Sequence, residues 1–175
     1  MIDVGLYVNE AEAALVADVI NRLYSIVGHE EMDSKIAVIT PYRAQVDCIT
    51  GVLRGQVQQA TTAIQWARRD IKVCSVDSMQ GSQRSVVIFS TTRSNAGGAT
   101  GFVKDMRRLN ASITRARYLD IIIADSKTMD TRGGEFGKGA DLLRQVYNFA
   151  LLPGKMEQGW QRHIATITVL LVEHI

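Results

Sequence analysis

The sequence contains few residues of the kinds that cross-link, ligate or anchor a small protein. Two cysteines, Cys48 and Cys74, occur in 175 residues, which excludes a disulfide scaffold and a cysteine-based zinc site. Both cysteines lie in apolar periodic stretches, so we expect buried free thiols. The longest apolar run, "IATITVLLV", is well short of the roughly 20 residues that a membrane-spanning helix needs. Without a signal peptide at Met1, the sequence predicts a cytoplasmic or nuclear protein with no membrane partner.

Charge of one sign is also missing. Lysine and arginine number 20, aspartate and glutamate 18, and the net charge is +2. The apolar fraction of 46% and the charged fraction of 22% are ordinary for a soluble globular domain of this length. Any argument for nucleic-acid binding must therefore come from local clusters of charge.

The chain also lacks the motif with which many proteins hydrolyse nucleotides. A phosphate-binding loop reads G-x-x-x-x-G-K-[ST], so that backbone N–H groups and the lysine hold the phosphates. The stretch "GGEFGKG" (133–139) is one residue short, and Gly139 replaces the hydroxyl that would bind magnesium. The three histidines have no ligand-like spacing, and no nucleophile elbow occurs. The chain alone is not expected to hydrolyse ATP.

The apolar period alternates between helical and strand-like spacing. The pattern predicts a helix that ends at Gly28 and begins with the capping pair Asn9 and Glu12, and a second helix that begins at Thr40 and Pro41. The second helix is expected to end near residue 54, with further helices at 57–69, 106–117 and 140–152. Aliphatic runs predict strands at 36–39, 71–76, 86–91 and 119–125.

This alternation predicts an α/β fold with a parallel sheet and helices on both faces. We assign residues 1–152 to one domain and leave the tail, 153–175, open between a helix and an added strand. Ligands of such sheets bind at loops that leave the carboxyl ends of the strands. Three polar stretches are expected at that edge: "TPYRAQ" (40–45), "DSMQGSQ" (77–83) and "TTRSN" (91–95).

The strongest local charge lies in "KDMRRLNASITRAR" (104–117). Five basic residues against Asp105 give +4 in one predicted helix and its entry. Such a helix is either a solvated basic face or a surface for phosphate, because the guanidinium group of arginine matches phosphate oxygens.

Taken in order, "ITPYRAQV", "VDSMQGSQ", "STTRSN" and "RRLNASITRARY" resemble motifs IV, V and VI of superfamily 1B helicases. The nearest group includes the nonsense-mediated decay helicase and its relatives that act on RNA or DNA. The resemblance covers roughly residues 6 to 125. It implies a RecA-like domain of the P-loop NTPase type that lacks the phosphate-binding loop itself.

The resemblance further implies the second RecA-like domain of an ATP-dependent 5′-to-3′ helicase, inactive without the first domain. ATP and Mg²⁺ would be held mainly by that first domain, which becomes a partner along with single-stranded RNA or DNA. Arg115 would be the arginine finger, and Gly81 and Gln83 would contact nucleotide. The implied single-strand track consists of Thr40, Pro41, Tyr42, Gln45, Ser78, Gln80, Arg93, Arg107, Arg108 and Asn110.

Two positions depart from the family pattern. Gln83 stands where relatives carry an acid near the ribose, and a neutral amide is a weaker acceptor. Glu10 stands where several members carry an arginine, and its carboxylate would repel a triphosphate. The alternative is therefore a degenerate RecA-like module that binds nucleic acid or protein without catalysis. The motifs do not distinguish RNA from DNA.

Overall fold

The computed structural model describes residues 7–27, 33–55, 71–79, 81–93 and 114–125, together with the backbone of a strand at 167–172. The two α-helices of this part are α1 (Glu10–Val27) and α2 (Arg43–Leu53). The strands are β1 (Ile36–Thr40), β2 (Lys72–Ser75), β3 (Arg84–Ser90), β4 (Ala116–Asp125) and β5 (Ile167–Val172). Two single-turn 3₁₀ helices, η1 (Asp33–Lys35) and η2 (Asp77–Met79), precede β1 and follow β2.

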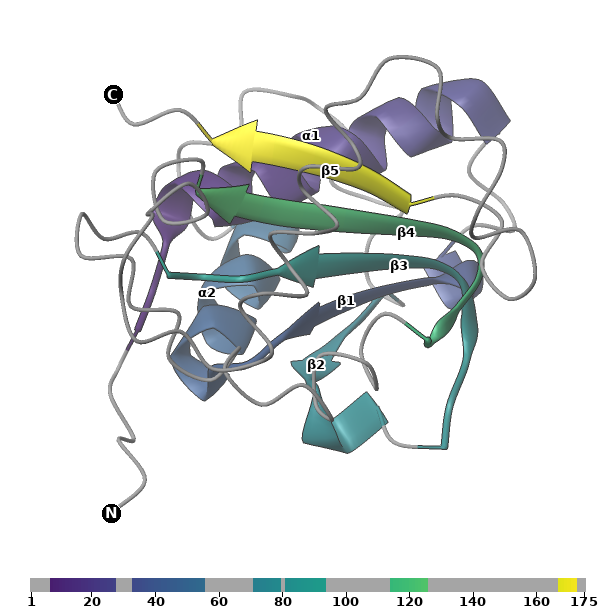
Figure 1. Cartoon of the computed structure of the whole chain (residues 1–175). Helices are drawn as coiled ribbons and strands as arrows, with labels where there is room; N and C mark the ends of the chain where they lie inside the picture. Colours follow the sequence, from purple (N-terminus) through teal and green to yellow (C-terminus); the bar gives the residue numbers. More distant parts are fainter. Residues whose placement is uncertain are drawn as a thin grey trace, which may run out of the picture.

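The strands form one five-stranded parallel sheet in the order β2-β1-β3-β4-β5 (Figure 1). β1, β3 and β4 lie in the middle of this order, and their central residues are buried. Burial of both faces explains why these strands read as continuous aliphatic runs. The predicted strands are confirmed, and the tail supplies β5, which pairs with β4.

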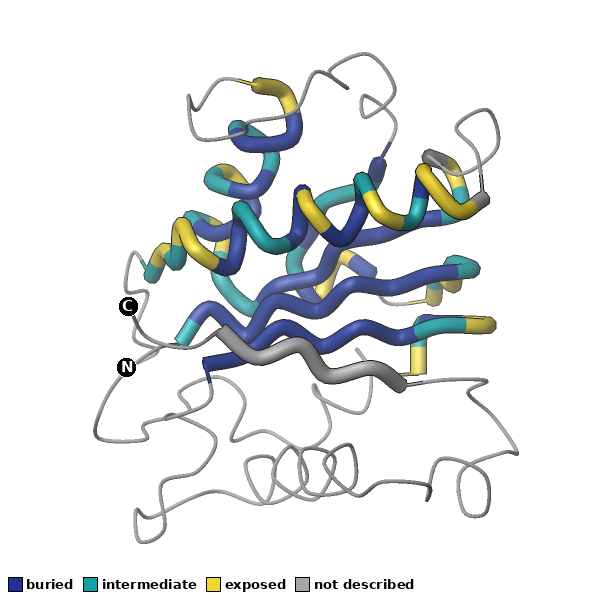
Figure 2. The backbone as a smooth tube through the Cα atoms, turned by 90° about the horizontal axis from the view of Figure 1, so that it is seen from above, coloured by how far each residue is buried: buried dark blue, intermediate teal, exposed yellow. Residues whose placement is uncertain are grey.

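Both described helices cover the same face of the sheet (Figure 2). α1 buries one stripe at helical spacing, which includes Ala13, Val16, Ile20 and Tyr24. This stripe packs in one core cluster with α2 and with the strand side chains that point to the same face. The predicted amphipathic helix therefore forms because its apolar face has a sheet to cover.

The opposite face of the sheet is also buried. Ala37, Ile39, Val87, Phe89 and Ile122 alternate in sequence with the core cluster residues and are at most 1% exposed. The predicted helices at 57–69 and 140–152, and most of the one at 106–117, lie outside the described residues. The described helices thus establish one covered face of the predicted α/β sandwich.

Two predicted helix boundaries are wrong. Thr40 is the last residue of β1 and Pro41 lies in a bend, so α2 begins at Arg43, with Tyr42 at the N-cap and no side-chain cap. Thr40 pairs with Ser75 in the parallel ladder, which keeps its backbone extended. The basic helix predicted to reach residue 117 does not include residues 114–117, because Thr114 and Arg115 form a turn and β4 begins at Ala116.

The two cysteines are free thiols, as predicted. Cys74 is buried in β2, whereas Cys48 is only partly buried in α2. Burial raises the pKa of both thiols above the ordinary value. Neither is therefore poised as a reactive thiolate.

Candidate functional site

Polar residues gather at the carboxyl edge of the sheet, defined here by the strand ends Thr40, Ser75, Ser90 and Asp125. The segments after β1 and β3 meet there, since the hydroxyls of Thr40 and Thr92 share a hydrogen bond of 2.8 Å. The prediction that "TPYRAQ" and "TTRSN" lie at this edge is confirmed for residues 40–45 and 91–93, which lie at or after the ends of the neighbouring strands β1 and β3.

A buried carboxylate, Glu12 of α1, binds the end of β3. Ser90 Oγ and the backbone N–H of Thr92 donate to its Oε2 at 2.6 and 2.9 Å, and Thr91 Oγ1 donates to its Oε1 at 3.2 Å. Asn9 Nδ2 lies 3.3 Å from the same Oε1. One carboxylate therefore holds three consecutive residues of a segment that is 78 to 80 positions away in sequence.

The electrostatics of Glu12 follow from this burial. The side chain is 0% exposed, and loss of solvation raises its pKa from 4.5 to about 7. The hydrogen bonds from Ser90, Thr92 and Thr91 oppose this rise, while the nearby charge of Asp125 adds to it. Desolvation therefore dominates, and Glu12 titrates close to neutral pH.

The sequence predicts that Asn9 and Glu12 cap each other at the start of α1, and only the bond from Glu12 N–H to Asn9 is confirmed. Asn9 Oδ1 accepts the backbone N–H of Glu12 at 3.0 Å, as an N-cap residue does. The return bond to the Asn9 backbone comes instead from α2, where Gln45 Oε1 accepts the Asn9 N–H at 2.7 Å. This exchange frees the Glu12 carboxylate to bind β3.

Gln45, a predicted contact to nucleic acid, is fully buried in this network. Its Nε2 donates to the Asn9 carbonyl at 3.0 Å and lies 3.3 Å from Ser90 Oγ. Thr40 is fully buried as well. The structure thus places both side chains beneath the carboxyl edge, where neither reaches the surface. Gln45 joins α2 to Asn9 and Ser90, and Thr40 joins β1 to Thr92.

The last of the three residues that Glu12 binds has a strained backbone. Thr92 has φ 68°, in the left-handed region that a β-branched residue rarely adopts. Such a conformation costs about 1–3 kcal/mol and persists only where surrounding contacts hold it. Here the N–H of Thr92 is bound by Glu12 and its hydroxyl by Thr40.

Beyond Thr92, an arginine lies on an aromatic pair. The guanidinium carbon of Arg93 is 4.2 Å from the ring centroid of Tyr7, a cation–π distance. The ring of Tyr7 meets that of Tyr42 edge to face, with centroids 5.0 Å apart. All three side chains are half-buried. The structure therefore joins two predicted track residues, Arg93 and Tyr42, through Tyr7, which the sequence did not single out.

The polar stretch after β2 connects the two edges of the sheet. It leaves the carboxyl end of β2, where Ser75 Oγ and Ser78 Oγ share a hydrogen bond of 2.8 Å. It then returns to the amino end of β3 through Gly81, whose φ of 79° favours glycine. The expectation that all of "DSMQGSQ" lies at the carboxyl edge is wrong, because the next strand, β3, runs parallel to β2 and must start at the opposite edge.

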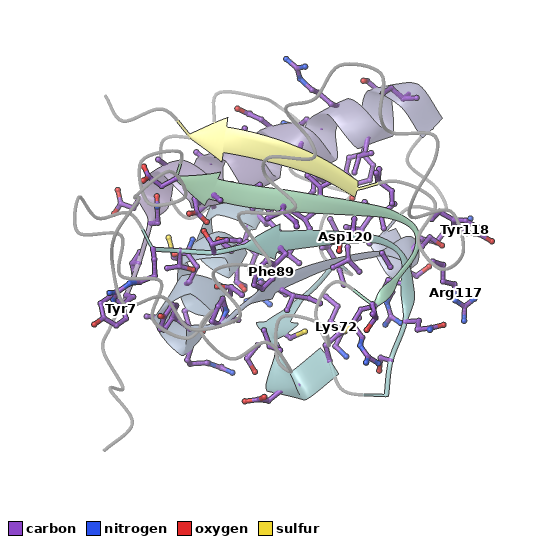
Figure 3. All side chains as sticks on the ribbon, in the orientation of Figure 1. Tyr7, Lys72, Phe89, Arg117, Tyr118 and Asp120 are labelled. Atoms are coloured by element: carbon purple, nitrogen blue, oxygen red, sulfur yellow. The ribbon has the colours of Figure 1, made fainter. Side chains whose placement is uncertain are left out.

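Predicted nucleotide contacts meet at that amino edge, defined here by the strand starts Ile36, Lys72, Arg84 and Ala116. The backbone N–H of Arg84 donates to the carbonyl of Arg115 at 3.0 Å, and Arg117 Nε lies 3.4 Å from Gln83 Oε1. Gln83 is exposed and Arg115 half-buried. Figure 3 shows Arg117 and Tyr118 at the end of the sheet opposite to Tyr7.

A register shift between β3 and β4 shapes this edge. Arg84 pairs with Ala116 but Val86 pairs with Leu119, so β4 carries one extra residue. Such a bulge re-aims side chains. Its two residues, Arg117 and Tyr118, are consecutive and both exposed. In a regular strand, side chains alternate between the two faces, and one of these two residues would be buried. The bulge instead leaves both exposed, with Arg117 close to Gln83.

Several predicted contacts lie outside the described residues: Gln80, Arg107, Arg108 and Asn110. Among the residues that the structure describes, no group of three histidine, cysteine, aspartate or glutamate side chains is placed to hold a metal ion. No helix in that same part of the chain is long and apolar enough to cross a membrane.

The sheet order and the two polar edges define an α/β domain of the RecA-like class. A family model described as "AAA domain" matches residues 3–127. A "Regulator of nonsense transcripts 1 homolog" from Neurospora crassa is 36% identical over 123 residues, which cover 70% of this chain and 11% of that protein. A "DNA polymerase alpha-associated DNA helicase A" from Saccharomyces cerevisiae is 31% identical over 134 residues, which cover 77% of this chain and 18% of that protein.

A "DNA polymerase alpha-associated DNA helicase A" from Schizosaccharomyces pombe is 34% identical over 137 residues, which cover 78% of this chain and 19% of that protein. The chain belongs to the AAA domain family and is a superfamily 1 helicase-like domain that resembles the nonsense-mediated decay group. It spans between 11% and 19% of the length of these relatives.

Proposed function

We propose that the chain is the second RecA-like motor domain of an ATP-dependent 5′-to-3′ helicase. In this role it supplies an arginine finger from its amino edge and part of the single-strand track from its carboxyl edge. The observation that carries the proposal is the meeting of Gln83, Arg115 and Arg117 at one edge, from segments about 30 residues apart. These segments carry the two motifs that resemble nucleotide-contacting motifs V and VI.

The residues at the amino edge could contact a phosphate group whose main binding site lies on another domain. Arg115 carries a permanent positive charge and is only half-buried, and Gln83 offers both a donor and an acceptor at the surface. Among the described residues, no acidic cluster is placed to hold Mg²⁺, and we assign the metal and most of the ATP contacts to a first RecA-like domain. Bound ATP would supply the phosphoryl group that is transferred to water.

Arg115 would then act on charge that develops during that transfer. Its guanidinium group would neutralise the equatorial oxygens of the γ-phosphoryl group, where negative charge spreads in the transition state. The short turn at 114–115, anchored by Arg84 N–H on the Arg115 carbonyl, fixes the backbone from which that side chain extends. A positioned arginine avoids reorganisation at the moment of reaction.

The test is Arg115→Ala in a protein that joins this chain to a domain with a phosphate-binding loop. ATP turnover should fall by about 10³- to 10⁵-fold, while ATP affinity stays nearly the same. Arg22→Ala is the matched control, because Arg22 is an exposed arginine of α1 outside the segments that resemble motifs V and VI, and it should leave turnover unchanged. Unchanged turnover in Arg115→Ala would refute the finger assignment.

A non-catalytic binding module is the second candidate. The observation that favours it is that the side chain of Gln83 is engaged by Arg117 of the same chain, at the position where family members carry an acid near the ribose. In that case the joined protein would bind single strands without strand-dependent ATP turnover. Gln83→Glu would then fail to raise turnover, whereas a gain would favour the motor.

A further inference from the structure

At the carboxyl edge, a buried hydrogen-bond network surrounds Ser90, the last residue of β3. Glu12 of α1 and Gln45 of α2 both bond Ser90, and Asn9, just before α1, bonds both of them, with every bond between 2.6 and 3.3 Å. Ser90 receives Gln45 Nε2 and donates its only hydroxyl proton to Glu12. A closed network of this kind fixes the direction in which the chain leaves Ser90.

After Ser90, Thr91 and Thr92 lead to Arg93, and the second of them has a left-handed backbone. Thr91 continues the ladder, since its N–H donates to the Ile123 carbonyl at 3.0 Å. Thr92, at φ 68°, then departs from the direction of the strand. The next residue, Arg93, lies over Tyr7, which is just before α1. The strain at Thr92 is therefore held where it determines the position of a cationic side chain.

Arg93, Tyr7 and Tyr42 together offer flat surfaces and positive charge. Arginine planes and tyrosine rings are the groups on which unpaired bases stack, at about 1–3 kcal/mol per base. We name these three residues the stacking platform. They come from three separate segments, before α1, before α2 and after β3, so their contact depends on the network that joins those segments.

We propose that Glu12 is a positioning residue for single-strand binding, which acts through Ser90, Thr91 and Thr92 to hold Arg93 on the stacking platform. The inference rests on the single-strand track of the proposed function and deepens it. It assigns Tyr7 to that track and gives Glu12, which no nucleic acid can reach, an indirect role. The ligand is unpaired RNA or DNA, recognised by base stacking.

The ionised form of Glu12 is the one that fits this role. A carboxylate accepts all four donors around it, whereas the protonated acid turns one oxygen into a donor and repels a neighbouring N–H or O–H. The charged group that acts on Glu12 from β4 is Asp125. Its hydrogen-bond partners are neutral: Asn9 before α1, and Ser90, Thr91 and Thr92 at the end of β3, while the neutral Gln45 of α2 bonds Ser90. Single-strand affinity should therefore rise as Glu12 ionises near pH 7.

The experiment measures fluorescence anisotropy of a labelled oligothymidylate with the 175-residue chain, from pH 5.5 to 8.5 at constant salt. Glu12→Gln keeps the shape of the side chain but cannot ionise, and it should weaken binding about tenfold at pH 8. Wild type should approach the variant below pH 6. Asp18→Asn, which removes an exposed charge from the same helix, should retain the wild-type profile.

A double-mutant cycle separates positioning from general structural damage. Arg93→Ala should weaken binding, and Glu12→Gln added to Arg93→Ala should weaken it little further, because Glu12 acts through Arg93. Additive losses, or a folded Glu12→Gln that binds as tightly as wild type at pH 8, would overturn the inference and leave the proposed track intact. A wild-type chain that binds no single strand would overturn the track and this inference together.

Discussion

The two edges of the sheet are built in opposite ways. At the carboxyl edge, polar side chains are buried and bind one another, so that Glu12, Gln45 and Ser90 have 0% exposure. At the amino edge, Gln83, Arg117 and Tyr118 are exposed, and a bulge presents the last two. One edge is organised by contacts within the chain, whereas the other presents donors and charge outward.

This difference fits the two roles that we propose, single-strand binding at the carboxyl edge and nucleotide contact at the amino edge. A surface that grips a mobile strand benefits from a fixed geometry, because ordering it during binding would reduce affinity. A surface that completes a nucleotide site needs a second domain opposite it, so its groups remain exposed in the isolated chain. The same parallel sheet supports both, because its strands present one set of ends at each edge.

The largest expected effect is on the free energy of unfolding, compared between one substitution at each edge. Glu12→Ala leaves the Ser90 and Thr91 hydroxyls and the Thr92 N–H without their acceptor, and it should lower the free energy of unfolding by about 2–4 kcal/mol. Gln83→Ala at the amino edge should change it by less than about 0.5 kcal/mol. Urea titrations at pH 8 would measure both. Equal losses would show that the edges are not built differently.

The second prediction concerns the pH dependence of stability. Glu12 has a folded pKa of about 7 against an ordinary value of 4.5, so the folded state binds the proton more tightly. The resulting stability is complete below pH 4.5 and is lost as the pH rises through 7, by up to about 3 kcal/mol. Urea titrations between pH 5 and 8 should show this fall in wild type.

Comparison with Glu12→Gln isolates that contribution. Burial also raises the pKa of Asp120, which adds a fall of the same sign to both proteins. The difference between wild type and Glu12→Gln therefore reports Glu12 alone. A difference that stays constant from pH 5 to 8 would show that Glu12 is ionised throughout that range.

The smallest expected effect concerns the loop that connects the edges. A Cβ at Gly81 would meet no atom within 4 Å, so Gly81→Ala is opposed by the backbone φ of 79° alone. The variant should lose about 1 kcal/mol of stability. Gly81→Asn should lose less, because asparagine tolerates the left-handed region. Equal stability of the two variants would show that the backbone conformation does not limit this turn.

Much of the fold could be predicted from the sequence because its signals are local. The stripe of α1 and the aliphatic runs of β1 to β4 each depend on spacing within a few residues, and these predictions are confirmed. The start of α2 was misplaced because Thr-Pro is a common helix entry, while here the ladder with β2 keeps Thr40 extended. The predicted basic helix includes residues 116 and 117 because they continue the basic stretch that starts at residue 104, whereas the structure places both in β4.

The contacts within the site were harder to predict from the sequence. Glu12 follows Asn9 at the spacing of a capping pair, and that local explanation concealed its bonds to residues near 90. Tyr7 carries no motif of its own and gains significance only from Arg93, which is 86 positions away. An acid at a position where the helical stripe faces the core was the one available signal, since buried carboxylates need partners.

The strand at 167–172 has a consequence for how the chain can be divided. β5 pairs with β4 along six residues, from Asp120 with Ile167 to Asp125 with Val172. Without it, β4 would become the edge of the sheet and expose the backbone donors and acceptors of the aliphatic run "DIIIAD". Such an edge invites pairing with another chain. Residues 167–172 thus cover the free edge of β4, and we expect a truncation before them to expose that edge to pairing with another chain.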